Sequence, residues 1–232
     1  RTDRAHLREA HEETPMRVLL LLDVSASMNY ASRPKLMTKL DYGRSALAAL
    51  SLVVRRQRDA GGIGLLAEEL SGYLPPSSSP GRLRSLWATL ETPASSRQTP
   101  LARTLAQAAD AAPRACLFVI ASDFYEEADA IADVIRRLRF EGHDALALHL
   151  ADPEEEDFTF SDPAQFQDPE TGSELPLDPP AAAAAYRAAF AAHRVRIHDL
   201  FLENGFAHLS LRTDVAPVDA LSAYLAVRAG RS

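Results

Sequence analysis

The sequence predicts an α/β protein built on a doubly wound, Rossmann-like and mostly parallel sheet. Short apolar runs of strand length alternate along the chain with longer segments of helical periodicity, as in strands joined by crossover helices. The runs are apolar at successive positions, which is typical of strands covered by helices on both faces. A chain of 232 residues suits one such domain with an elaboration. We therefore expect a single domain over residues 1–232, with an arm at 1–15 and a β-hairpin insertion at 152–178.

The central strand is expected at residues 16–22, where every residue except Arg17 is apolar. The polarity then changes abruptly, because Asp23, Ser25 and Ser27 place a carboxylate and two hydroxyls at alternate positions after the strand. Ligands of open α/β sheets bind just beyond the carboxyl ends of strands. All three side chains offer the hard oxygen atoms that Mg²⁺ or Ca²⁺ prefers. This loop is therefore a candidate metal site.

Two later segments extend this candidate site. Thr99 precedes a helical pattern, and Asp123 ends another apolar run of the buried-strand type. Thr99 alone could equally be an ordinary helix N-cap, with Pro100 at the first helical position. Its assignment to a metal site therefore depends on the other two loops.

The elements before Thr99 follow from periodicity and from turn residues. The expected order is a helix at 39–58, a strand at 61–67 with a short hairpin partner at 73–74, a loop at 75–80 and a helix at 82–90. Three glycines at 61–64 match neither the dinucleotide nor the P-loop spacing, so we interpret them as turn and close-approach residues. Trp87 lies at helical spacing with leucines and is expected to pack in the core.

The second half continues the alternation and then departs from it. The expected elements are helices at 101–112, 126–141, 178–204 and 218–228, strands at 115–122, 144–150 and 206–211, and a hairpin at 158–177 around the turn 168–172. Five carboxylates at 152–157 lack the glycine and the ligand spacing of an EF-hand loop, so a solvated acidic turn is expected there.

Composition narrows the class of protein. A formal charge of −7 and a pI near 5.5 argue against a nucleic-acid binder, which needs a basic field. No apolar run approaches the roughly 18 residues of a membrane span, and no signal peptide is visible, so we expect a cytoplasmic location and no membrane contact from this segment. The chain begins without Met, which suggests that a preceding segment is missing. Cys116 is alone and suits a reducing compartment.

The three loops together resemble the metal-ion-dependent adhesion site of von Willebrand factor A domains. Flanking motifs narrow the resemblance to a bacterial von Willebrand factor A-like family of unknown function whose members commonly accompany MoxR-type AAA+ ATPases. These motifs are Glu9-Ala-His-Glu-Glu-Thr-Pro15, Lys39-Leu-Asp-Tyr42, Asp152-Pro-Glu-Glu and Leu211-Arg-Thr-Asp214.

The resemblance implies a fold, an ion and a partner. It implies a von Willebrand factor A fold with one divalent cation, Mg²⁺ first and Ca²⁺ or Mn²⁺ as substitutes. The implied hydroxyl ligands are Ser25, Ser27 and Thr99, while Asp23 and Asp123 would bind directly or through water. An open position on the cation would accept a carboxylate from a MoxR-type AAA+ ATPase or its client, so the chain would be an adaptor or chaperone component and not an enzyme.

Three other interpretations remain open. A Mg²⁺-dependent phosphoryl-transfer hydrolase could use Asp23 as nucleophile, although such enzymes expect an aspartate where Ser25 stands. A serine hydrolase using Ser25 or Ser27 lacks the Gly-x-Ser-x-Gly elbow and a nearby His and Asp. The fold could also bind partners by packing alone, with a vacant metal site. His193 and His198 are five residues apart, which does not suit a zinc pair on one helix face.

Overall fold

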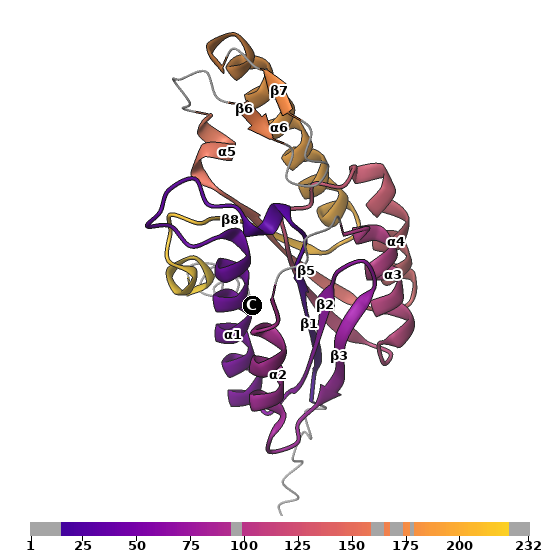
Figure 1. Cartoon of the computed structure of the whole chain (residues 1–232). Coiled ribbons are helices and arrows are strands. Elements are labelled where there is room, and N and C mark those ends of the chain that lie inside the picture. The colour runs from indigo at the N-terminus through magenta and orange to yellow at the C-terminus, as the bar shows by residue number, and fades with distance from the viewer. Residues whose placement is uncertain (1–14, 94–98, 159–164, 168–173, 177–178, 223–232) are drawn as a thin grey trace, which may run out of the picture.

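A computed structural model describes residues 15–93, 99–158, 165–167, 174–176 and 179–222. Within these residues a six-stranded sheet has the order β3-β2-β1-β4-β5-β8, and every neighbouring pair is parallel except β2 and β3 (Figure 1). Its strands are β1 Arg17–Asp23, β2 Ala60–Leu66, β3 Leu70–Ser77, β4 Cys116–Ser122, β5 Asp144–Ala151 and β8 Ala207–Arg212. The predicted doubly wound α/β fold is thereby confirmed.

Helices cover both faces of this sheet (Figure 1). Side chains of Leu20 and Leu22 pack on the face with α1 and α2, and those of Leu19 and Leu21 pack on the face with α3, α4 and α6. The helices are α1 Lys39–Arg56, α2 Arg82–Leu90, α3 Leu101–Ala111, α4 Ala128–Phe140, α5 Pro153–Asp157 and α6 Pro179–Glu203. A further helical stretch at 217–222 lies on the α1 side, where Leu221 joins the core. The apolar runs of β1 and β4 are therefore buried on both faces, as their composition predicts.

The order of the strands reverses at the middle of the sheet. From β1 the chain passes through α1 to β2 on one side, and after β3, α2 and α3 it enters β4 on the other side of β1. The carboxyl ends of β1 and β4 therefore flank a topological switch point, the usual ligand position in open α/β sheets. Asp23 is the last residue of β1, and Asp123 directly follows β4.

Two predictions of local structure are wrong. The strand β3 runs through Pro75 and Pro76, which were expected in a loop; an edge strand tolerates proline because one row of its N–H groups needs no partner. Trp87 is 40% exposed instead of lying in the core, and its Nε1 donates to Ser51 Oγ at 3.1 Å. A tryptophan at the border between the buried and the exposed face of a helix can bury part of its ring and still form a hydrogen bond through its indole N–H.

The expected hairpin is present in its described part. Strands β6 Gln165–Gln167 and β7 Glu174–Pro176 pair antiparallel with each other as a separate two-stranded sheet, so the insertion does not extend the edge of the central sheet. Its predicted turn at 168–172, the arm at 1–14 and the predicted helix beyond 222 lie outside the described residues. The described residues thus fold around the six-stranded sheet, with the insertion between β5 and α6.

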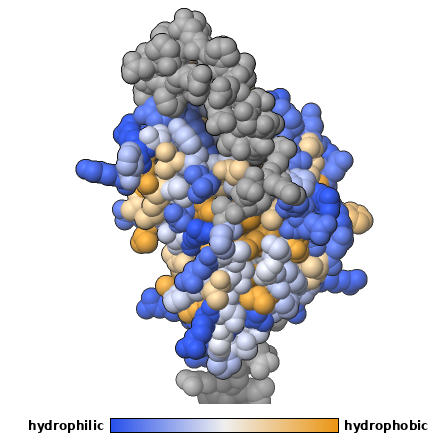
Figure 2. Space-filling view, in the orientation of Figure 1, coloured by the Kyte–Doolittle hydropathy of each residue, from blue (hydrophilic) through white to orange (hydrophobic). Residues whose placement is uncertain are grey.

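The described surface mixes hydrophilic and apolar residues, and Figure 2 shows the apolar ones as separate patches among hydrophilic neighbours. In the part of the chain that the structure covers, no helix combines the length and the hydropathy needed to cross a bilayer.

Candidate metal centre

The first candidate loop is shaped by hydrogen bonds from its own backbone and side chains. The backbone N–H of Ser25 donates to Asp23 Oδ1 at 2.9 Å, which turns the chain sharply after β1. A short 3₁₀ helix, η1 Ser27–Asn29, follows, and the hydroxyls of Ser25 and Ser27 lie 3.0 Å apart. All three predicted side chains are at most 3% exposed. Burial of three polar groups at the end of a strand indicates a preorganised polar site and not a solvated turn.

The second candidate loop positions Thr99 without making it a helix cap. The N-cap of α3 is Pro100, and the Thr99 hydroxyl donates to the carbonyl oxygen of Leu66 at the end of β2. Thr99 is 7% exposed. The alternative assignment of Thr99 as an N-cap is therefore wrong, because its side chain turns toward the sheet and not toward the first turn of α3.

The third candidate loop holds Asp123 beside Asp23. The hydroxyl of Ser122 donates to Asp23 Oδ2 at 2.7 Å and accepts from the backbone N–H of Phe124 at 2.9 Å. Phe124 has a φ of 52°, which is costly for a residue with a side chain, and complete burial of its ring offsets that cost. His193 Nε2 lies 2.7 Å from the Phe124 carbonyl oxygen and donates to it in the matching tautomer. The backbone that presents Asp123 is thus fixed from several sides.

All five predicted donors line one small cavity. Its volume is about 20 Å³, and its wall also includes Leu101, Tyr125 and Glu126. Such a volume accommodates an object of the size of one water molecule. The predicted donors that share it are Asp23, Ser25, Ser27, Thr99 and Asp123. Five oxygen-bearing side chains around a space for one small particle fit a hard divalent cation in size and in donor chemistry.

The electrostatics of this cavity favour a positive ligand. The pKa of Asp23 is raised from 3.8 to about 6, mainly by burial and also by the nearby charge of Asp123, while hydrogen bonds from Ser122 and Ser25 partly offset this rise. The carboxylate form of Asp23 is therefore costly without a counter-charge. Among the described residues no three His, Cys, Asp or Glu side chains form a metal-binding group, so a cation here depends on the hydroxyl donors.

Lys39 is a component of the site that the sequence did not reveal. Its side chain is fully buried, and its Nζ donates to Asp123 Oδ2 at 2.8 Å and to Glu155 Oε1 at 2.5 Å. The ammonium also lies 4.5 Å from the centre of the Tyr125 ring. Burial lowers the pKa of Lys39, but the two carboxylates outweigh burial and hold the pKa above its ordinary value. Lys39 therefore remains charged next to the candidate metal ligands.

The expected solvated turn at 152–157 is wrong, because this segment is the helix α5. Asp152 and Glu155 form a capping box: the Asp152 side chain accepts from the backbone of the first turn, and Glu155 Oε2 accepts from Asp152 N at 2.8 Å. Asp152 is completely buried, and its Oδ2 accepts from the backbone of Ser32 at 2.9 Å. Carboxylates at a helix N-terminus stabilise it through the helix dipole, which a count of charges in the sequence does not reveal.

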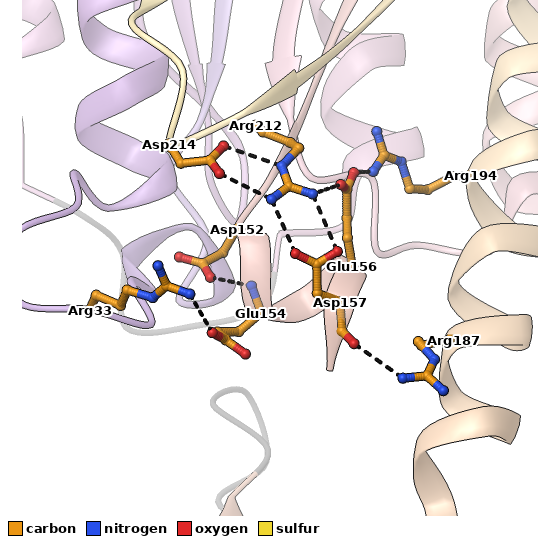
Figure 3. Close-up of polar contacts among 9 residues, drawn as sticks. All are labelled: Arg33, Asp152, Glu154, Glu156, Asp157, Arg187, Arg194, Arg212 and Asp214. Carbon is orange, nitrogen blue, oxygen red and sulfur yellow. Dashed lines mark hydrogen bonds and ion pairs between the residues drawn. The ribbon is translucent and has the colours of Figure 1, made fainter. Parts of the chain in front are cut away.

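Arginines from three other elements neutralise the outer carboxylates of α5, as Figure 3 shows. Arg212 of β8 contacts Glu156 at 2.9 Å and Asp157 at 3.2 Å, and Arg194 of α6 also pairs with Glu156. Arg33, from the loop before α1, donates to Glu154 at 2.8 Å. The acidic segment is therefore docked by ion pairs to the body of the domain, which places Glu155 beside Lys39.

The histidines form a different arrangement from a zinc site. His198 Nδ1 lies 3.2 Å from His208 Nδ1, and His208 Nε2 lies 3.1 Å from His149 Nδ1. The two contacts use opposite nitrogens of His208, so the three rings form a chain and do not converge on one point. His193 contacts the Phe124 carbonyl instead. His193 and His198 therefore have separate partners, the Phe124 carbonyl and His208.

Comparison with known proteins identifies the fold and the family. The structure is similar to BatB, a conserved hypothetical protein from Bacteroides thetaiotaomicron, with a TM-score of 0.55 and 15% identity over 94% of this chain and 100% of that chain. It is also similar to the von Willebrand factor A (VWA) domain of SpRpn10, with a TM-score of 0.51 and 9% identity over 90% of this chain and 94% of that chain. No curated protein sequence matches significantly.

These structural similarities establish a VWA-like fold. The sequence model of DUF58, described as a protein of unknown function, matches residues 1–198. The chain therefore belongs to the DUF58 family and is a VWA-like domain.

Proposed function

We propose that this domain binds protein partners through a divalent cation, Mg²⁺ first, held by the five oxygen donors of the cavity. The observation that carries the proposal is the convergence of Asp23, Ser25, Ser27, Thr99 and Asp123 on a single cavity of about 20 Å³. We further propose a MoxR-type AAA+ ATPase or one of its clients as the partner, on the basis of the family resemblance in the flanking motifs.

The donor set explains why such a site would suit a partner's carboxylate. Ser25, Ser27 and Thr99 are neutral donors, so they bind a cation without cancelling its charge. Asp123 is already paired with Lys39. A cation held in this way would retain affinity for an additional anionic oxygen, and Mg²⁺ readily keeps exchangeable water positions. The protein's own residues would orient the ion and exclude bulk water from its buried side.

The phosphoryl-transfer alternative has a weaker basis. It requires an acid two positions after Asp23, where Ser25 instead donates its backbone N–H to Asp23 and lies against Ser27. Metal-dependent release of phosphate from a model phosphomonoester that disappears in Asp23→Asn would support that alternative over the interaction module.

The direct test is Mg²⁺ titration by calorimetry, with Thr99→Ala, Thr99→Ser and Thr89→Ala as variants. Thr89 is a matched control because its hydroxyl bonds to Ser85 within α2, away from the cavity. We expect Thr99→Ala to weaken binding about tenfold or more, because one ligand oxygen is lost, and Thr99→Ser and Thr89→Ala to bind like the parent. Equal binding by Thr99→Ala and Thr89→Ala would contradict the proposal.

The partner is tested separately by capture of purified MoxR-type ATPase on the immobilised domain. Binding in millimolar Mg²⁺ that is lost in EDTA and in Thr99→Ala, but kept in Thr89→Ala, is the expected result. Binding that ignores both chelator and variant would instead favour packing without a metal.

A further inference from the structure

We propose that Lys39 is a positioning residue that sets the cation affinity of this site through its ion pairs with Asp123 and Glu155. The inference rests on the proposed function, because it concerns the same cavity. The Lys39 ammonium contacts Asp123 but is not part of the cavity lining, so it is not a further ligand of the cation.

The position of Lys39 is electrostatically unfavourable by local criteria. It is the first residue of α1, where the positive end of the helix dipole disfavours a cation. It is also fully buried, and a buried charge carries a large desolvation cost. An apolar side chain would fill the same space without either cost, so packing alone does not explain a lysine.

Its partners link the cavity to α5. Asp123 lines the cavity. Glu155 does not line the cavity but belongs to the capping box at the N-terminus of α5. Lys39 Nζ lies between them, at 2.8 Å from Asp123 and 2.5 Å from Glu155. The hydroxyl of Tyr125, another residue of the cavity wall, donates to the same Glu155 oxygen at 2.6 Å. One ammonium is thus shared between a candidate ligand and a carboxylate outside the cavity.

This sharing controls how much negative charge the cavity presents. With Lys39 in place, the charge of Asp123 is partly balanced before any cation arrives. Removing the ammonium would leave Asp123 uncompensated and strengthen attraction for a cation. Removing the charge of Glu155 would leave Lys39 to act on Asp123 alone and would weaken that attraction. The two changes therefore have opposite signs, although both break a buried ion pair.

The opposite effects of the two changes on cation affinity distinguish this role of Lys39 from a purely structural one. If Lys39 only fastened α1, the loop after β4 and α5 together, Lys39→Met and Glu155→Gln would both lower stability and neither would tighten cation binding. Lys39→Arg keeps the charge. Glu155→Gln keeps one acceptor oxygen for Lys39 and Tyr125, but its NH₂ group then faces the backbone N–H of Asp152, so thermal unfolding must accompany the titration to measure the loss of this capping contact.

The experiment is Mg²⁺ titration of the parent, Lys39→Met, Lys39→Arg and Glu155→Gln, with thermal unfolding in EDTA and in Mg²⁺. We expect Lys39→Met to bind about tenfold tighter or more and to gain more thermal stability from Mg²⁺ than the parent does. Glu155→Gln should bind several-fold weaker, and Lys39→Arg should stay within about threefold of the parent.

The outcomes distinguish this inference from the proposed function. Loss of binding in Thr99→Ala together with unchanged affinity in folded Lys39→Met would overturn the role of Lys39 and leave the metal site standing. No binding in the parent or in Lys39→Met would overturn both. If Lys39→Met does not fold even in Mg²⁺, Glu155→Gln decides: weaker binding supports the inference, and equal or tighter binding refutes it.

Discussion

Replacing Asp23 with asparagine should stabilise the metal-free domain at neutral pH. Asp23 is 3% exposed and close to the charge of Asp123, and burial is the larger cause that raises its pKa from 3.8 to about 6. A difference of about two pH units corresponds to about 3 kcal/mol. Because the folded pKa lies above the unfolded value, stability falls as pH rises from 3.8 to about 6, and the full cost is present above that range.

The expected gain is smaller than this cost, because asparagine changes one hydrogen bond. Its amide oxygen can still accept from Ser25 N, but its NH₂ group faces Ser122 Oγ, which now donates to the carboxylate and accepts from Phe124. Rearranging that contact costs about 1 kcal/mol. We therefore expect Asp23→Asn to raise the free energy of unfolding by about 2 kcal/mol in EDTA near pH 7.5.

Urea unfolding, followed by Trp87 fluorescence and far-ultraviolet circular dichroism, measures this difference. The gain should shrink near pH 5, where the parent carboxyl is protonated, and Mg²⁺ should stabilise the parent but not the variant. Asp133→Asn is the matched control, since Asp133 lies in an exposed ion pair with Arg136, and it should change stability by less than about 0.5 kcal/mol. The reasoning is refuted if Asp23→Asn is less stable than the parent in EDTA at neutral pH.

Two further predictions concern the scaffold. Burial, together with the nearby charges of His198 and Arg194, lowers the pKa of His208 from 6.5 to about 4. The unfolded state therefore binds a proton at a higher pH than the folded state does, and stability should drop by about 2 to 3 kcal/mol as the pH falls from 6.5 to 4. Burial also lowers the pKa values of His149 and His143, so urea midpoints of His208→Gln should show a smaller loss of stability over this pH range but not its complete absence; an unchanged slope would contradict the assignment. Gly62→Ala should cost about 2 to 4 kcal/mol, because a Cβ there would lie 2.7 Å from backbone atoms of β3. Gly81→Ala, with open space around it, is the control for the same thermal measurement and should be nearly neutral.

Local patterns were sufficient to predict the sheet and the candidate donors. Each donor follows an apolar strand or precedes a helix, so the change from apolar to polar residues marks its position. The strand order then brings the loops together, because β1 and β4 are neighbours at the point where the order reverses. Thr99 shows the limit of such patterns, since a threonine before Pro100 has the local pattern of a helix cap and yet bonds to Leu66.

Contacts between distant segments were not predictable in this way. Lys39 lies 84 residues from Asp123 and 116 residues from Glu155, and its periodic surroundings indicate only the start of a helix. No residue pattern near Lys39 predicts that its ammonium is buried. The solvated turn predicted for the acidic run containing Glu155 is wrong for the same reason: the cations that neutralise this run come from the loop before α1, from α6 and from β8.

The net charge of the cavity and of the residues that contact Lys39 predicts which cation the site binds. Apart from the partly exposed Glu126 of the cavity wall, Asp23, Asp123 and Glu155 contribute three negative charges when ionised, and Lys39 contributes one positive charge, which leaves two negative charges. A divalent cation would balance them and a monovalent cation would not. The same count orders the variants by net charge: Lys39→Met leaves three negative charges and Glu155→Gln leaves one, so Mg²⁺ affinity should fall from Lys39→Met to the parent to Glu155→Gln. A different order would mean that distance from the cavity, and not total charge, governs what the site binds.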